Sequence, residues 1–69
     1  MRRERVTSSN IAEIGYDEPS RTLEVMFNNG RIYQYFEVPQ QVYRELVGES
    51  SIGKYLNAHI KGTYRYARV

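Results

Sequence analysis

Apolar and polar residues alternate in two neighbouring stretches of the chain, 11–17 and 21–27. In the second stretch Leu23, Val25 and Phe27 occupy every other position. A period of two places such residues on one face of a β-strand, because successive side chains point to opposite sides. The pattern predicts two half-buried strands, and the first is expected to present one face made of Ala12, Ile14 and Tyr16.

Turn signals separate these strands from each other and from a third strand at 31–38. In the first turn, at 17–20, Pro19 fixes its own φ, and the Asp and Ser side chains bond to nearby backbone. The second turn, Asn28-Asn29-Gly30, is a strong hairpin signal. The first half of the chain is therefore predicted to form an antiparallel β-meander.

The length of the hairpin loop decides which face carries Tyr33 and Tyr35. A two-residue turn places Gln34 on the same face as Leu23, whereas a three-residue loop with a left-handed Gly30 places the two tyrosines there. A slip of one residue exchanges the faces, so the two arrangements exclude each other. We favour the three-residue loop, because it keeps the polar Gln34 out of the core.

The spacing of apolar residues becomes helical after Pro39, which is expected to be the first residue of a helix. The apolar stripe of this helix consists of Val42, Tyr43, Leu46 and Val47. Gly48 stands where a left-handed C-terminal cap belongs. A second helix is predicted at 51–61 and ends at Gly62, and its stripe consists of Ile52, Tyr55, Leu56, His59 and Ile60.

The junction of the two helices, GESSIGKY at 48–55, nearly matches the phosphate-binding loop G-x-x-x-x-G-K-[ST]. Tyr55 replaces the hydroxyl residue that binds Mg²⁺ in that motif. A phosphate loop also follows a buried strand, whereas a helix is predicted here. We interpret the match as two helix ends, although a helix N-terminus with Lys54 in its first turn is still able to meet one phosphate group.

The last stretch, 63–69, alternates again and predicts a strand if it pairs with the sheet. The expected fold is a single α+β domain over 1–69, in which two short helices pack against a small antiparallel meander. That meander has three strands, or four if the C-terminus joins it. Residues 1–9 are expected to form a flexible leader.

Composition limits how so small a domain is stabilised. The 69 residues include no cysteine and one histidine, which excludes disulfides and argues against a zinc site. Good packing or self-association is left to stabilise a thin core. The leader lacks the apolar run of a secretory signal, and no stretch approaches the length of a membrane span. We therefore expect a cytoplasmic protein without metal or cofactor.

The sequence contains few side chains that are suited to catalysis. His59 lies on the apolar stripe of the second helix, where a lone histidine is more often a core-edge residue than a base. Asp17 and Glu18 are the only adjacent carboxylates, and their turn is expected to be solvated. The sequence predicts a protein that is not an enzyme.

Residues that are suited to binding nucleic acid are more numerous. Residues 51–69 carry four basic and no acidic residues, and the chain contains seven tyrosines. Arginine alternating with tyrosine suits single-stranded nucleic acid, RNA above all, because phosphates meet the cations and bases stack on the rings. The predicted contacts are Lys54, Lys61, Arg65 and Arg68 for phosphates, with Tyr64 and Tyr66 for stacking.

Two alternatives stay open at this point. Tyr is a favoured strand residue, so Tyr33 and Tyr35 are more readily explained as core-filling side chains than as ligand contacts. An aromatic sheet face and a thin core also fit a protein-interaction or homodimer module that uses 63–69 as an edge strand.

These motifs together resemble the KTSC domain, which occurs at the C-terminal end of some lysyl-tRNA synthetases and as free-standing bacterial or phage proteins. The matching motifs are I-x-x-I-G-Y-D (11–17), L-x-V-x-F (23–27), G-x-x-Y-x-Y (30–35), V-P-x-x-V-Y (38–43), S-x-G-K-Y-x-N-x-x-I-K (51–61) and the final Y-x-Y. The resemblance places the family's central Y-x-Y on Tyr33 and Tyr35. It implies RNA binding only by association with the synthetases.

Overall fold

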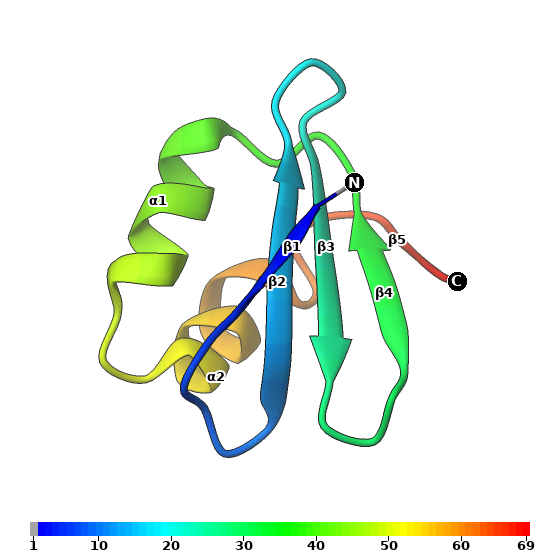
Figure 1. Ribbon diagram of the computed structural model, residues 1–69. Coiled ribbons are helices and arrows are strands. Elements are labelled where there is room, and N and C mark those ends of the chain that lie inside the picture. The colour runs from blue at the N-terminus through cyan, green and yellow to red at the C-terminus, as the bar shows by residue number, and fades with distance from the viewer. Residues whose placement is uncertain (1) are drawn as a thin grey trace.

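A computed structural model describes residues 2–69 and shows one antiparallel sheet with helices on one of its faces (Figure 1). The strands follow in the order β1-β2-β3-β4-β5 and are β1 (Arg3–Arg5), β2 (Ile11–Asp17), β3 (Thr22–Phe27), β4 (Ile32–Tyr35) and β5 (Tyr66–Arg68). The helices are α1 (Gln40–Gly48) and α2 (Ile52–Tyr55), which continues as the π-helical segment η1 (Leu56–Ile60). The predicted α+β class is confirmed, and the sheet has five strands where three or four were expected.

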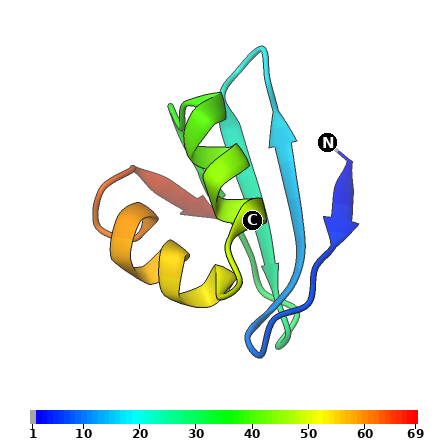
Figure 2. The same ribbon diagram turned by 90° about the vertical axis from the view of Figure 1, so that its left-hand side faces the viewer.

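The helix-facing side of β3 carries the apolar residues that the alternation predicts. Leu23 and Val25 are fully buried, and they pair with Tyr16 and Ile14 of β2. Directly opposite residues of an antiparallel pair share a face, so all four side chains point toward the helices. Figure 2 shows this arrangement edge-on, with the helices packed on one side of β2 and β3.

A β-bulge near the start of β2 changes one predicted core position. The register shifts between Ile11 and Glu13, which leaves Ala12 as the extra residue. Ile11 is consequently buried at 1% exposure, whereas Ala12 is only half-buried. The predicted face Ala12, Ile14 and Tyr16 is therefore wrong at its first position.

The β3–β4 hairpin has the three-residue loop that the polarity of Gln34 favoured. Val25 pairs with Tyr33 and Leu23 pairs with Tyr35, so both tyrosines share the apolar face. Gly30 adopts a φ of 86°, the left-handed conformation that glycine adopts without strain. The strand is shorter than the predicted 31–38.

The early end of β4 has a backbone cause. Glu37 takes a left-handed φ of 57°, which breaks the extended conformation two residues after Tyr35. The Val38 N–H then donates to the carbonyl oxygen of Arg21 at 2.9 Å. The chain thereby crosses the end of the sheet and enters α1.

Helix α1 begins and ends differently from the prediction. Pro39 has ψ of 148° and precedes the first helical residue, Gln40. Gly48 is the last helical residue and not a left-handed cap. The chain leaves the helix through an extended Glu49, whose N–H donates to the carbonyl oxygen of Leu46. That bond satisfies a terminal carbonyl without a left-handed residue, so the cap prediction is wrong.

The second helical segment buries Ile52, Leu56 and Ile60, which recur at every fourth position. The Lys61 N–H donates to the carbonyl oxygen of Leu56, five residues earlier, so the segment ends in a wide π-turn. His59 is exposed and not at the core edge as predicted. The four-residue spacing of the buried side chains leaves it outside the apolar stripe.

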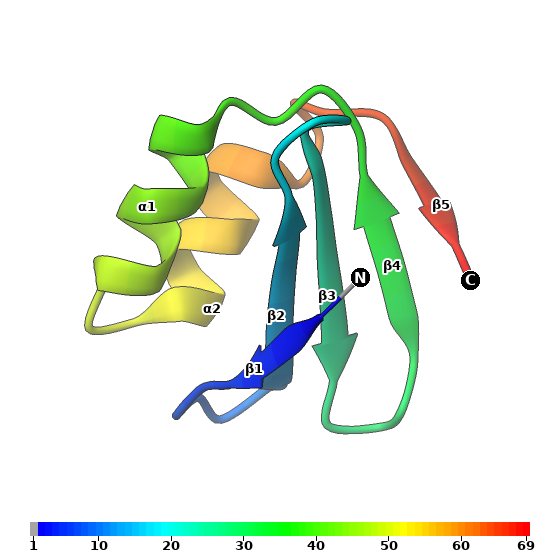
Figure 3. The ribbon, with the colours of Figure 1, turned by 45° about the horizontal axis from the view of Figure 1, so that its top comes forward.

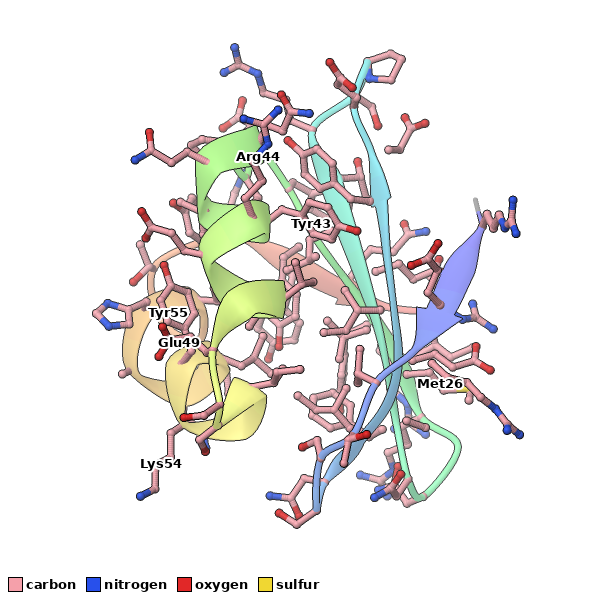
Figure 4. The ribbon with its side chains drawn as sticks, turned by 60° about the vertical axis from the view of Figure 1, so that its left-hand side comes forward. Met26, Tyr43, Arg44, Glu49, Lys54 and Tyr55 are labelled. Carbon is pink, nitrogen blue, oxygen red and sulfur yellow. The ribbon has the colours of Figure 1, made fainter. Side chains whose placement is uncertain are left out.

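Two aromatic rings join α1 to the sheet. The rings of Tyr16 and Tyr43 stack with centroids 4.7 Å apart and planes 9° from parallel. The Tyr16 hydroxyl also donates to the carbonyl oxygen of Val38 at 2.5 Å. In Figure 4 the labelled Tyr43 points from α1 toward the sheet, which agrees with this packing.

The opposite face of the sheet carries a polar network. Strand β1 lies beside β2 (Figure 3) and pairs with it, which places Arg3 opposite Gly15. The Arg3 guanidinium donates to Glu13 at 2.9 Å and to Glu24 at 2.5 Å, and Gln34 donates to Glu24 at 2.8 Å. The leader was not expected to contain a strand, and β1 forms because this network and the β2 backbone hold it.

The network also sets the ionisation of Glu24, which is 7% exposed. Burial by itself raises the pKa of this carboxyl group. The hydrogen bonds from Gln34 and Arg3 stabilise the charged form, and together they lower the pKa of Glu24 below its usual value. The paired, charged state is therefore the favoured one.

The near-match to a phosphate-binding loop spans the end of α1 and the whole of α2. A helix precedes it instead of a buried strand, so its interpretation as two helix ends is confirmed. Within residues 2–69, no helix has the length and apolar character needed to cross a membrane.

Candidate nucleic-acid interface

Strand β5 carries Tyr66 and Arg68 onto the helix-facing side of the sheet. Tyr66 pairs with Tyr35, and Arg68 pairs with Tyr33, so each pair shares that face. The Tyr66 ring centroid lies 5.7 Å from that of Tyr33 and 5.8 Å from that of Tyr35. Tyr35 is 3% exposed and Tyr66 is 62% exposed. The cluster therefore combines one buried ring, that of Tyr35, with one accessible ring, that of Tyr66.

These rings line a hollow of about 320 Å³ between the β4–β5 edge and the end of η1. Its lining residues, which define the tyrosine hollow, are Tyr33, Tyr35, Lys61, Gly62 and Tyr66. Gly62 has a φ of 81° and turns the chain from η1 toward β5. The turn at this glycine leads the chain back toward β5, so that the end of η1 and the rings line the same hollow.

A second hollow of about 430 Å³ adjoins the first and shares Tyr33 and Lys61 with it. The lining of this asparagine hollow also includes Phe27, Arg31 and four amide side chains, Asn10, Asn28, Asn29 and Asn57. The Lys61 ammonium lies 5.3 Å from the Phe27 ring centroid, within the range of a cation–π contact. Lys61 therefore stands at the boundary between the two hollows.

A third hollow, of about 470 Å³, shares Asn10, Gly53 and Asn57 with the asparagine hollow. It also contains Lys54 and several serines, and we name it the serine hollow. Figure 4 shows Lys54 extending outward from α2. The three hollows are linked by common lining residues, and we refer to them together as the groove.

The groove has a one-sided charge. In the part of the chain that the structure describes, no Asp or Glu lines any of the three hollows. Arg31, Lys54 and Lys61 all line it, and Arg68 lies on the same sheet face opposite Tyr33. Because acidic side chains are absent from the lining, the positive potential of these cations is not cancelled locally.

The predicted binding residues fall into two groups. Lys54, Lys61 and Tyr66 line the groove, and Arg68 lies on the same sheet face opposite Tyr33. Tyr64 is half-buried against the core.

Arg65 is the other predicted residue outside the groove. Its exposed guanidinium lies 4.0 Å from the carboxylate of Glu37. The structure thus gathers most of the predicted cations and separates Arg65 and Tyr64 from them.

Sequence reasoning missed one side of the groove. Arg31 and the four asparagines come from the leader end, the β3–β4 turn and η1, far apart along the chain. No local motif joins them. The available signal was Arg31 in the hairpin turn, a cation close to Tyr33 in sequence. Tyr33, explained from sequence as a core residue, is half-buried and lines both neighbouring hollows.

The second helix contains another polar contact, outside the groove lining. The Tyr55 hydroxyl donates to the Glu45 carboxylate at 2.8 Å, and this bond is the main reason why the pKa of Tyr55 rises to about 12. The His59 ring centroid lies 4.6 Å from that of Tyr55. The exposed imidazole therefore packs against the Tyr55 ring.

Comparison with known proteins gives the family. The sequence profile of the KTSC domain family matches residues 7–66. The chain belongs to the KTSC domain family. The crystal structure of a KTSC domain protein from Yersinia pestis is 35% identical, has a TM-score of 0.93, and is matched over 99% of this chain and 96% of that one. The resemblance seen in the sequence motifs is thereby confirmed.

KTSC relatives differ in the length of the protein that carries the domain. A Stutzerimonas stutzeri protein described as uncharacterized is 37% identical and is matched over 100% of this chain and 99% of its own length. A lysine–tRNA ligase from Trichormus variabilis is 38% identical over 59 residues, which make up 86% of this chain and 10% of the ligase. The domain thus occurs both in small proteins and as a small part of an enzyme.

Proposed function

We propose that this KTSC domain is a non-enzymatic module that binds single-stranded RNA along the groove. The observation that carries the proposal is the lining of the three neighbouring hollows, which combines tyrosine, asparagine and basic residues without a carboxylate in the described chain. Phosphates would meet Lys54, Lys61 and Arg68, and a base would stack on Tyr66. Arg65 and Tyr64 have smaller parts, because one is paired with Glu37 and the other packs against the core.

The physical argument favours a single strand over a duplex. Proteins hold single strands by combining a basic groove with aromatic rings on which bases stack, and each stacked base contributes about 1–3 kcal/mol. Among the tyrosines in residues 2–69, only Tyr66 offers a largely exposed ring, whereas Tyr35 is almost fully covered. With one open ring and a few cations, we expect weak binding that depends steeply on salt.

The family context supports RNA over DNA as the ligand. Relatives of the domain lie within lysine–tRNA ligases, proteins whose named substrate is a tRNA. This support is an association between domains, and the groove itself supplies the chemical argument.

A salt titration of affinity for an unstructured oligoribonucleotide tests the proposal. Each phosphate neutralised on a single strand contributes about 0.7 to the slope of log affinity against log salt, so Lys61→Ala should lower the slope by about that amount. Arg44→Ala is the matched control, since this variant also removes one positive charge. Arg44 lies on α1 (Figure 4) and lines none of the three hollows. Absence of binding at low salt, or equal losses in the two variants, would refute the proposal.

Self-association through β5 is the second candidate function. The Phe36 N–H donates to Arg65 and the Val69 N–H donates to Ile32, so the backbone groups of Tyr66 and Arg68 point away from β4 at the sheet edge. Such an edge is able to pair with another strand. Sedimentation equilibrium separates the candidates: a tight dimer that occludes Tyr66 favours association, and a monomer excludes it.

A further inference from the structure

The position of Lys61 suggests the size of the smallest RNA fragment that the groove recognises. Lys61 lines both the tyrosine hollow and the asparagine hollow, and its ammonium is held over Phe27. The volumes of about 320 and 430 Å³ fall at the small end of the range for ligand pockets. Two compartments of this size on either side of one cation suit two bases joined by one phosphate.

Resting on the proposed function, we infer that the recognition unit is a dinucleotide step. Its linking phosphate binds Lys61, one base stacks on Tyr66 in the tyrosine hollow, and the other base enters the asparagine hollow. A longer strand continues past Gly53 and Asn57 toward Lys54, because the serine hollow shares those residues. That extension adds electrostatic affinity without another stacking ring.

The two compartments differ in what they are able to read. The tyrosine hollow presents ring faces, and every base stacks on a ring, so this side tolerates any sequence. In the asparagine hollow the Asn28 amide donates to the Ser9 carbonyl oxygen at 2.8 Å, and the Asn29 side-chain oxygen accepts from the Arg31 N–H at 3.0 Å. These bonds orient two of the four amides.

An amide presents a donor and an acceptor together, which suits the hydrogen-bonding edges of unpaired bases. Asn57 is exposed on η1 and adds a third amide to the same hollow. Base selectivity is therefore expected at the nucleotide in the asparagine hollow and not at the nucleotide on Tyr66.

Competition by short fragments tests the inference. A fluorescently labelled, unstructured eight-nucleotide RNA is the probe, and the competitors are a nucleoside, a nucleoside 5′-monophosphate, dinucleoside monophosphates and a trinucleotide. The dinucleoside monophosphate should compete about tenfold better than the mononucleotide, because it adds a second base contact. The step to the trinucleotide should be smaller. Among dinucleoside monophosphates, exchanging the base at one position should change affinity, and at the other position should not.

Single-residue variants test the role of each compartment and of the cation between them. Lys61→Ala should weaken the fragments that carry a phosphate and leave the affinity of the nucleoside unchanged, and Lys61→Arg should restore binding of the dinucleoside monophosphate. Asn57→Ala should weaken base selectivity while the preference for two nucleotides over one remains. Arg44→Ala should leave the fragment series unchanged.

The outcomes separate this inference from the proposed function. If affinity rises evenly with fragment length, or if the mononucleotide equals the dinucleoside monophosphate, the dinucleotide unit is wrong and RNA binding stands. If no fragment and no longer RNA binds at low salt, both are wrong.

Discussion

The two faces of the sheet use basic residues in opposite ways. On the face away from the helices, Arg3 donates to both Glu13 and Glu24, and Gln34 donates a further hydrogen bond to Glu24. On the helix-facing side near β5, Lys61 contacts the ring of Phe27 in a groove that no carboxylate lines within residues 2–69.

The difference teaches which charges are available to a ligand. A cation that already has carboxylate partners gains little from a phosphate, whereas a cation over an aromatic ring keeps its charge uncompensated. We therefore assign a structural role to the Arg3 cluster and a binding role to the groove. Four predictions test that division.

Gly15→Val should have the largest effect, on stability. A Cβ at Gly15 would lie 2.6 Å from the carbonyl oxygen of Arg2 and 2.9 Å from the Arg3 side chain, so β1 has to move. Overpacking of this kind costs about 3 kcal/mol of unfolding free energy. Urea denaturation measures the loss. Gly48→Ala is the control, since nothing lies within 4 Å of its new Cβ and alanine favours a helix.

Tyr66→Ala should have the next largest effect, on RNA affinity. Removing the exposed ring abolishes the stacking of one base, which contributes about 1–3 kcal/mol. A value in the lower part of that range corresponds to about a tenfold loss of RNA affinity. Tyr66→Phe should retain most of the affinity, because the ring face is kept. Fluorescence anisotropy gives both values, and equal losses in the two variants would assign the effect to the hydroxyl group instead of stacking.

Acid should weaken the Arg3 face through Glu24. Because the folded-state pKa of Glu24 is depressed, its stabilising contribution is present above its usual value of 4.5 and is lost as the pH falls through the lower folded value. The urea midpoint should decline over that acid range, and Glu24→Gln should make the decline shallower. An unchanged decline in the variant would mean that other carboxylates control acid stability.

Arg3→Gln should have the smallest effect on RNA binding. Arg3 is separated from the groove by the sheet and already pairs with two carboxylates. We expect the affinity and its salt dependence to match those of the unmodified protein, while the variant is less stable in urea. A loss of RNA affinity in the folded variant, similar to that of Lys61→Ala, would remove the distinction between the faces.

Local sequence patterns determined the middle of this protein. Alternation predicted β2 and β3, and the turn at Gly30 predicted their extension into a third strand. The polarity of Gln34 selected the loop length that places Tyr33 and Tyr35 on the core face. These features depend on residues close together in the chain, and their hydrophobic period and turn chemistry are sufficient to specify them.

Tertiary structure decided the edges of the sheet and the composition of the groove. Strand β1 depends on the absence of a side chain at Gly15 and on the distant carboxylate of Glu24. The asparagine hollow combines Asn10, Arg31 and Lys61 from three separate segments. Periodicity describes which face of its own element a side chain occupies, but it does not specify which remote segment lies across from it. That pairing follows from how the helices close over the sheet, and it alone brought the basic residues and the rings together.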